Sequence, residues 1–265
     1  MLAAVLGSPV SHSLSPLLHN AAYRALGLPH EYSAIEVSAA ELPDFIRGRN
    51  SLWLGVSLTM PLKEVAFAVA ETVTSIAVLA RSINTLIFAD RIEGDNTDII
   101  GIVRAVEESA VGPFRRMVLI GSGATARSAI VAAGQLGVQD ITAVARNHGA
   151  LAECAAVAAQ VGIPFADVPI SQTRFDAETL TINTTPSGVA DALVPHLDSV
   201  TGTLLDVIYH PWPTSLARHW QDNGGTAVPG HIMLLHQAAK QVQLMTGRSA
   251  PVEAMRSALE QALQN

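Results

Sequence analysis

A lysine and an aspartate in the first part of the chain have the types expected of an acid–base pair. Lys63 lies in the segment GVSLTMPLK, where Thr59 as N-cap and Pro61 in the first turn predict the start of a helix. The helix dipole disfavours a cation at this end, so helix stability alone does not explain the lysine. Asp98 opens a second predicted helix in GDNTDIIG, where it either complements that helix's dipole or faces Lys63. An aspartate beside the lysine would hold the ammonium and favour its charge, and such a lysine can give and take protons.

Hydroxyl groups gather in the segment GSPVSHSLSPLLHN, ahead of a helix predicted to begin near Pro16. Any one serine there has helix capping as its simplest explanation. Several hydroxyls that converge on a helix N-terminus also form a site for a small carboxylate. His12 and His19 are seven residues apart, with no cysteine or acidic pattern around them, and we expect no metal site.

A glycine turn in VLIGSGATARSAI has the position of a dinucleotide site. Gly121 and Gly123 follow a predicted buried strand and precede a helix, where a pyrophosphate binds backbone N–H groups. Ala126 replaces the third glycine, and this place requires only a small residue. An ordinary tight turn between strand and helix is the alternative.

The residue that follows the next predicted strand indicates which dinucleotide is bound. An NAD site usually has Asp or Glu there to hold the ribose hydroxyls, whereas this chain has Arg146 and Asn147. An arginine suits a 2′-phosphate because its planar guanidinium donates charge-assisted hydrogen bonds. The sequence therefore favours NADP, with an ordinary surface arginine as the alternative.

The composition excludes several classes of protein. Hydrophobic residues make up 49% and charged residues 15%, which is typical of large buried cores and not of disorder. The net charge of −7 argues against a broad nucleic-acid interface. No apolar run approaches the roughly 18 residues of a membrane span, and the start, MLAAVLGSP, reads as a strand and not as a signal peptide. The single cysteine, Cys154, excludes an internal disulfide, and we expect a cytoplasmic protein that binds neither nucleic acid nor membrane.

Strand-like and helix-like segments alternate along the chain, which predicts an α/β fold with a doubly wound parallel sheet in its second part. NTLIFAD and RIEGD are expected to pair with each other, PFADVPI is a weak strand, VGPF at residues 111–114 resembles a linker, and the tail is helical. We expect one domain over residues 1–100, with helices at 231–265 packing back onto it, and a Rossmann-type dinucleotide-binding domain over 101–230. The active site would lie in the cleft between them.

Taken together and in order, eight motifs resemble the shikimate dehydrogenase family along nearly the whole chain. They are GSPVSHSLSPLLHN, GVSLTMPLK, INTL, GDNTDIIG, GSGATARSA, INTTPSG, DVIYHPWPTSL and GHIMLLHQAAKQ. The resemblance implies reversible reduction of 3-dehydroshikimate to shikimate with NADPH, in the shikimate pathway of aromatic amino-acid biosynthesis. It also implies that the first domain binds the substrate.

The resemblance further implies a role for each matching residue. Lys63 and Asp98 would be the catalytic pair. Ser57 stands where the family usually has asparagine. The implied substrate-binding residues are Ser13, Ser15, Ser57, Thr59, Asn84, Tyr209 and Gln237. The implied cofactor-binding residues are Gly121, Ser122, Gly123, Ala124, Thr125, Arg146, Asn147, Thr184, Val207, Gly230 and Met233.

Two other functions stay open at this point. One is a dehydrogenase of the same family that uses NAD or also accepts quinate. The other is a non-catalytic NADP-binding regulator with this fold, which would have no need of both Lys63 and Asp98. The expected partner is a small-molecule substrate, and a homodimer is an open alternative to a monomer.

Overall fold

The computed structural model describes residues 1–109, 112–145, 147–197 and 200–264. The chain divides into two compact units. The first unit comprises Met1–Asp98 and Leu234–Asn265, and the second comprises Ile99–Met233. The expected linker at 111–114 begins outside the described residues, and the rest of it belongs to the second unit.

The first unit is built on a mixed sheet with the strand order β2-β1-β3-β5-β6-β4. Strand β1 lies between β2 and β3 and is parallel to both, whereas β5 runs antiparallel to both β3 and β6. The expected pairing of NTLIFAD with RIEGD is thereby confirmed as β5 and β6. The strands are β1 (Leu2–Gly7), β2 (Glu31–Glu36), β3 (Trp53–Leu58), β4 (Thr72–Val73), β5 (Thr85–Phe88) and β6 (Ile92–Asp95).

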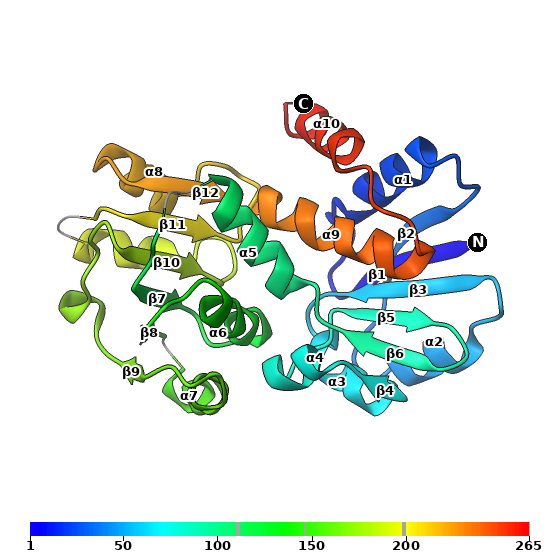
Figure 1. Cartoon of the computed structure of the whole chain (residues 1–265), viewed down its shortest axis with the longest axis horizontal. Coiled ribbons are helices and arrows are strands. Elements are labelled where there is room, and N and C mark those ends of the chain that lie inside the picture. The colour runs from blue at the N-terminus through cyan, green and yellow to red at the C-terminus, as the bar shows by residue number, and fades with distance from the viewer. Residues whose placement is uncertain (110–111, 146, 198–199, 265) are drawn as a thin grey trace. The chain divides into compact units, whose positions relative to one another are not determined.

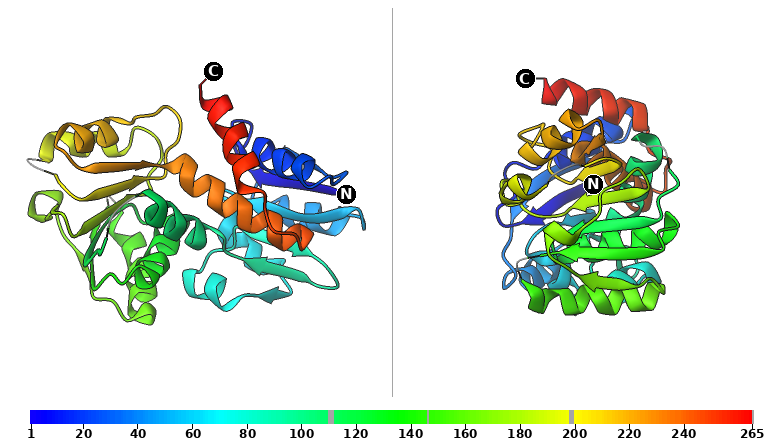
Figure 2. Two further views of the ribbon diagram at one scale, coloured as in Figure 1. Left: turned by 45° about the horizontal axis from the view of Figure 1, so that its top comes forward. Right: turned by 90° about the vertical axis from the view of Figure 1, so that its left-hand side faces the viewer.

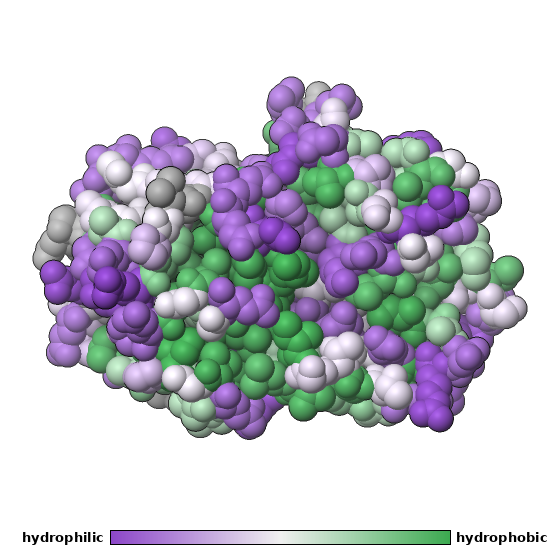
Figure 3. Space-filling model, in the orientation of Figure 1, coloured by the Kyte–Doolittle hydropathy of each residue, from purple (hydrophilic) through white to green (hydrophobic). Residues whose placement is uncertain are grey.

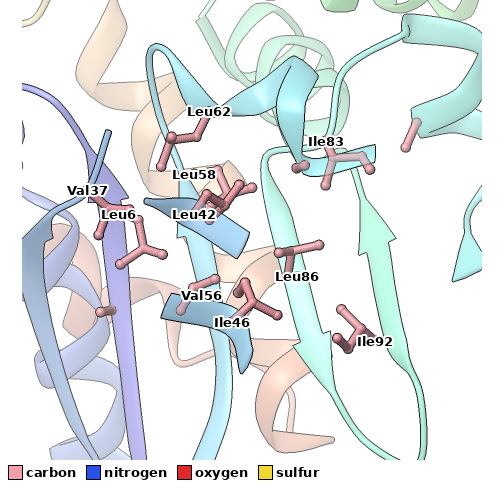
Figure 4. Close-up of a cluster of buried hydrophobic side chains, with 13 residues drawn as sticks. Leu6, Val37, Leu42, Ile46, Val56, Leu58, Leu62, Ile83, Leu86 and Ile92 are labelled. Carbon is pink, nitrogen blue, oxygen red and sulfur yellow. The ribbon is translucent and has the colours of Figure 1, made fainter. Parts of the chain in front are cut away.

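Helices cover both faces of this sheet, as the strand pattern requires. Because side chains alternate across a strand, Leu6 and Val56 face one side, where Figure 4 shows them in an apolar core with residues from α2 and α3. Val5 faces the other side, towards α1 and α9, and α10 packs on α1 and α9 (Figures 1 and 2). The helices are α1 (Ser15–Ala25), α2 (Leu42–Gly48), α3 (Leu62–Val65), η1 (Ala66–Ala68), α4 (Ser75–Ala80), α9 (Gly230–Thr246, in this unit from Leu234) and α10 (Val252–Leu263).

The helix that carries Lys63 begins later than the sequence predicts. Its N-cap is Pro61 and no side chain caps it, so the predicted cap by Thr59 is wrong. Thr59 contributes its carbonyl oxygen instead, which accepts a hydrogen bond from the Leu62 amide at 2.8 Å. The α-helix has only four residues before it tightens into η1, and so few aligned peptide units produce a weak dipole. The electrostatic environment of Lys63 therefore depends more on its ion-pair partner than on the dipole of this helix.

The second unit has a fully parallel sheet in the order β12-β11-β10-β7-β8-β9. Read from the β9 edge and numbered within the unit, this is the 3-2-1-4-5-6 order of a Rossmann fold, and the predicted fold class is confirmed. The strands are β7 (Arg116–Ile120), β8 (Asp140–Val144), β9 (Phe165–Asp167), β10 (Thr179–Asn183), β11 (Thr203–Asp206) and β12 (Thr226–Pro229). The helices are α5 (Asp98–Ser109), α6 (Ala124–Gln135), α7 (His148–Val161), η2 (Ile170–Gln172), η3 (Ala190–His196) and α8 (Ser215–Asp222).

The surface mixes polar and apolar residues. Figure 3 shows hydrophilic residues along the viewed face with apolar residues between them. Within the described ranges, no helix combines the length and the apolar character that crossing a membrane requires.

Candidate active site

Lys63 and Asp98 form an ion pair within the first unit. The Lys63 Nζ lies 2.6 Å from the Asp98 Oδ2, and the side chains are 14% and 7% exposed. Asp98 is the first residue of α5, and its backbone N–H donates to the Asn96 side chain at 3.0 Å, so Asn96 fixes the start of this helix. A pair that is this close and partly shielded from water has a strong mutual attraction and can place a proton at one defined position.

Asn84 orients the carboxylate from its other side. Its Nδ2 donates to the Asp98 Oδ1 at 2.8 Å and to the Thr97 Oγ1 at 3.0 Å. Its Oδ1 accepts from the Thr97 backbone N–H at 2.8 Å and from the Thr85 hydroxyl at 2.8 Å. A side-chain amide has two N–H donors and two acceptor lone pairs, so these four bonds use its whole capacity, and the Thr97 hydroxyl makes a further, longer contact of 3.2 Å with the Oδ1. In this arrangement Asn84 serves Asp98, and a ring hydroxyl of a substrate would have to replace one of the four bonds.

Ser57 is held by a buried tyrosine. The Ser57 Oγ and the Tyr32 Oη form a hydrogen bond, and both residues are at most 4% exposed. Burial raises the pKa of the Tyr32 hydroxyl, so this group stays protonated at all ordinary pH values. The register of β3 and β5 sets Ser57 opposite Thr85, which places both hydroxyls on the sheet face that α1 and α9 cover.

The other expected substrate-binding residues of the first unit lie on three elements. The Ser13 Oγ accepts from the Ser15 backbone N–H at 3.2 Å at the start of α1. Gln237, on α9, donates one N–H to the Leu234 carbonyl at 3.1 Å and is 7% exposed. Thr59 packs tightly on Gly7, where a Cβ atom would lie 2.3 Å from the Thr59 Cγ2. That position requires glycine, because any side chain would push the GVSLTMPLK segment off β1.

The glycine turn of the second unit lies at the point where the strand order reverses, between β7 and β10. Gly121 has a φ of +114°, and a Cβ there would be 2.4 Å from the Thr184 Oγ1. Thr184 in turn donates its backbone N–H and its hydroxyl to the Ile120 carbonyl. At Gly123 an added Cβ would meet nothing within 4 Å, and the first turn of α6 has no acidic residue. Open space over an uncapped helix N-terminus suits the pyrophosphate of a dinucleotide.

Gly230 and Val207 meet where the neighbouring strands β12 and β11 of the same sheet end. A Cβ on Gly230 would lie 2.1 Å from the Val207 carbonyl oxygen, so only glycine allows this approach. Met233 follows on α9 and is buried, and Tyr209 is half-buried in the loop after β11. The structure places Tyr209 in the second unit, whereas the six other expected substrate-binding residues lie in the first.

The remaining expected cofactor residues lie near the glycine turn and after β8. Ser122 uses its carbonyl oxygen to accept from the Cys154 thiol at 3.7 Å, and burial raises the pKa of that thiol to about 11. The Asn147 Oδ1 accepts from the Ala150 N–H at 3.2 Å and caps α7. Arg146 lies outside the described residues. Among the residues that the structure does describe, no three His, Cys, Asp or Glu side chains group as metal ligands.

Several buried polar residues escaped the sequence analysis. Thr85 and Gln241 extend the hydrogen bonds of Asn84. Gln241 follows Gln237 by four residues on one helix, and this spacing was the signal that could have pointed to it. In the second unit, Asp206 accepts from Asn183 at 2.9 Å and from Thr214 at 2.7 Å, which ties together the loops after β10 and β11. Burial raises the pKa of Asp206, and the hydrogen bonds that it accepts oppose this shift.

The fold and these groups define a class of protein: a dinucleotide-dependent oxidoreductase with a separate unit that carries a lysine–aspartate pair. Comparison with known proteins identifies the family. The family model of the shikimate dehydrogenase substrate binding domain matches residues 5–86, and that of the shikimate 5′-dehydrogenase C-terminal domain matches residues 230–260. The NADP(+) shikimate dehydrogenase of Moorella thermoacetica is 32% identical, over 99% of this chain and 93% of the relative.

Solved structures agree. A shikimate dehydrogenase from Mycobacterium tuberculosis is 42% identical with a TM-score of 0.88, and the match covers 98% of this chain and 99% of the other. A shikimate 5-dehydrogenase from Thermus thermophilus, solved in complex with NADP(H) and shikimate, is 29% identical with a TM-score of 0.87. That match covers 99% of this chain and 100% of the other. The chain belongs to the shikimate dehydrogenase family.

Proposed function

We propose that this protein is an NADP-dependent shikimate dehydrogenase that reversibly reduces 3-dehydroshikimate to shikimate. The observation that carries the proposal is the contact of 2.6 Å between the Lys63 ammonium and the Asp98 carboxylate, in a chain that also has a Rossmann-type unit. The resemblance of the substrate-binding motifs and the names of the relatives support shikimate as the substrate. A cytoplasmic location and a homodimer stay predictions.

The first unit binds the substrate in this proposal. Ser13 and Ser15 bind its carboxylate at the start of α1, where hydroxyl and backbone donors meet. Ser57, Thr59 and Gln237 contact the ring hydroxyls, whereas only the resemblance to the family assigns Tyr209, a residue of the second unit, to the carboxylate. Asn84 was also expected here, and its four internal hydrogen bonds support a role in orienting Asp98.

The second unit binds NADP. The pyrophosphate is held by Gly121, Ser122, Gly123, Ala124 and Thr125. The turn at position 121 has no room for a Cβ atom and therefore requires glycine, which fits that role. Thr184, Val207, Gly230 and Met233 line the ribose and nicotinamide end. The sequence pattern alone assigns Arg146 and Asn147 to the side of the cofactor that carries the 2′-phosphate. When bound, the cofactor supplies or accepts the hydride.

Lys63 donates and accepts the proton that the reaction transfers. In reduction its ammonium donates to the carbonyl oxygen as negative charge develops there, and in oxidation the neutral amine removes the hydroxyl proton. Asp98 holds the ammonium at 2.6 Å and keeps it aimed at one place while the proton moves. Asn84 occupies the second carboxylate oxygen and leaves Oδ2 for the lysine.

A spectrophotometric assay of the purified chain tests the function. We expect reduction of NADP with shikimate, and a higher kcat/KM with NADP than with NAD. Turnover of quinate at a similar rate would broaden the substrate class, and a preference for NAD would contradict the assignment of Arg146. No turnover with any of these pairs would favour a non-catalytic NADP-binding regulator.

The variant Lys63→Ala tests the mechanism. General acid–base groups contribute about 10²- to 10⁴-fold, so we expect kcat to fall by that factor while KM changes little. Circular dichroism controls for folding. Lys240 is the other lysine of the chain, and on α9 its ammonium donates to the Gln243 side chain at 3.4 Å, so Lys240→Ala is the matched control and should keep its rate. A folded Lys63→Ala enzyme with near-normal kcat would exclude the lysine as the acid–base group.

A further inference from the structure

A continuous row of buried hydrogen bonds runs from the catalytic pair to a histidine on α1. Asn84 receives a hydrogen bond from Thr85 at 2.8 Å, and Thr85 receives one from the Gln241 Nε2 at 2.9 Å. The Gln241 Oε1 lies 3.2 Å from the His19 Nε2. Thr85, Gln241 and His19 are fully buried, and Asn84 is 1% exposed. The residues come from β5, α9 and α1, and Thr85 and Gln241 are 156 positions apart in the sequence.

The direction of each bond follows from groups whose chemistry leaves no choice. The Thr97 backbone N–H can only donate, so it must meet the Asn84 Oδ1, and the Asp98 carboxylate can only accept, so it must meet Nδ2. Because the Asn84 Oδ1 cannot donate, the Thr85 hydroxyl must give its proton to it. Thr85 then has only lone pairs left for Gln241, which must present its N–H.

The far end of the row is fixed by the same logic. With its N–H on Thr85, Gln241 turns its carbonyl oxygen to His19, so His19 carries its proton on Nε2. The His19 Nδ1 has no hydrogen-bond partner among the described residues. This agrees with an unprotonated Nδ1, because a buried N–H without an acceptor would be more costly. Burial lowers the pKa of His19 to about 3, so the ring stays neutral and this pattern persists at ordinary pH. Every bond from His19 to Asn84 thus donates toward Asp98.

From this arrangement we propose that Thr85 and Gln241 are positioning residues for the acid–base step, acting through Asn84 on Asp98 and Lys63. Hydrogen bonds aligned in one direction polarise one another and strengthen the last bond, from Asn84 to the carboxylate. Stability alone does not call for such a row, because apolar groups of the same shape can replace both partners of a buried hydrogen bond at little cost. The expected effect on the reaction rate rests on the proposed function, whereas the expected effect on the contact between Lys63 and Asp98 does not.

The substitution Thr85→Val removes the hydroxyl and keeps the shape of the side chain. The Asn84 Oδ1 then keeps only the donors of Thr97 and loses the one on the Thr85 side, so its amide can turn, which releases the Asp98 carboxylate. The conservative variant Thr85→Ser restores the hydroxyl. On the same unit, Thr246→Val removes a hydroxyl hydrogen bond to the Val242 carbonyl that has no link to the row, and is the matched control.

The first measurement needs neither substrate nor cofactor. Lys63 and Lys240 are the two lysines of the chain, so ¹³C-lysine labelling gives two Cε signals, which Lys63→Arg assigns. We expect the Lys63 signal to shift in Thr85→Val at a fixed pH and to return in Thr85→Ser, while Lys240 stays unchanged throughout. A Lys63 signal that does not move in a folded Thr85→Val protein would overturn the proposal, as would an equal shift in Thr246→Val.

The second measurement is kinetic. Loss of one neutral hydrogen bond corresponds to about a 2- to 10-fold effect, and we expect it in kcat with an altered pH profile and little change in KM for shikimate. A rise in KM alone would contradict a positioning role. If the wild type does not turn over shikimate, the proposed function fails, while the lysine signal still decides the proposal. Where Thr85→Val does not fold, Gln241→Met with the same readouts decides it.

Discussion

At the scale of single residues, two buried tyrosines of the first unit differ in one respect. The Tyr32 Oη bonds to Ser57, whereas the Tyr23 Oη is buried without a hydrogen-bond partner in the described chain. Burial raises the pKa of both hydroxyls, so both remain neutral. The difference lets one tyrosine serve as the control for the other, and it shows that Tyr32 has a task beyond packing: it fixes the hydroxyl of Ser57.

The variant Tyr32→Phe should weaken shikimate binding. Without its partner the Ser57 hydroxyl loses its fixed orientation, and a neutral hydrogen bond is worth about 0.5–1.5 kcal/mol. We expect KM for shikimate to rise about 2- to 10-fold with kcat nearly constant, measured by steady-state kinetics. Tyr23→Phe should leave KM unchanged. If the two variants raise KM equally, the effect comes from packing and not from Ser57.

At the scale of elements, the close approach of the α9 N-terminus to the loop after β11 depends on one glycine. Gly230 lies against the Val207 backbone, and its N–H donates to the Ile208 carbonyl at 3.3 Å. Both Gly230 and Val207 are proposed to line the nicotinamide end of the cofactor. The backbone at this place is therefore as much a part of the proposed site as any side chain, and a methyl group would separate the two elements.

The variant Gly230→Ala should destabilise the second unit and weaken NADP binding. The new Cβ would lie 2.1 Å from a backbone oxygen that cannot swing away, and overpacking of this kind costs about 1–3 kcal/mol. Urea unfolding and the Kd for NADP, measured by fluorescence titration, check this. At Gly48 a Cβ meets nothing within 4 Å, so Gly48→Ala should change neither quantity appreciably. Unaltered NADP binding in Gly230→Ala would exclude Gly230 from the cofactor site.

At the scale of the whole molecule, local patterns predicted the strands and helices better than the contacts that join them. Alternation and glycine placement identified β7, the turn after it and α6, because these signals lie within one short segment. The short strand β12, with glycines before it and Pro229 at its end, carried no such signal. The bond from Gln241 to Thr85 was out of reach because it depends on the packing of α9 over β5, and no local pattern encodes that.

The burial of His19, at the end of this row, makes the stability of the first unit depend on pH. His19 has a pKa of about 3 in the folded protein against about 6.5 when unfolded, mainly because burial disfavours the charged ring. Above about pH 6.5 both states are neutral and the histidine adds no pH dependence. Between the two values the unfolded chain binds one more proton than the folded chain, so the free energy of unfolding falls as pH falls.

The size and origin of that fall can be measured. The slope from this one group approaches about 1.4 kcal/mol per pH unit between the two pKa values and levels off below the lower one. We expect urea unfolding of His19→Gln to show a shallower loss of stability from pH 6.5 to pH 4 than the wild type, even if the variant starts from a lower value because it loses the stacking on Tyr32. His12 is exposed, so His12→Gln should follow the wild-type slope. Parallel slopes for His19→Gln and the wild type would show that folding does not lower the pKa of His19, and its burial would then not be a source of the pH dependence, although its Nε2–H would still donate to Gln241.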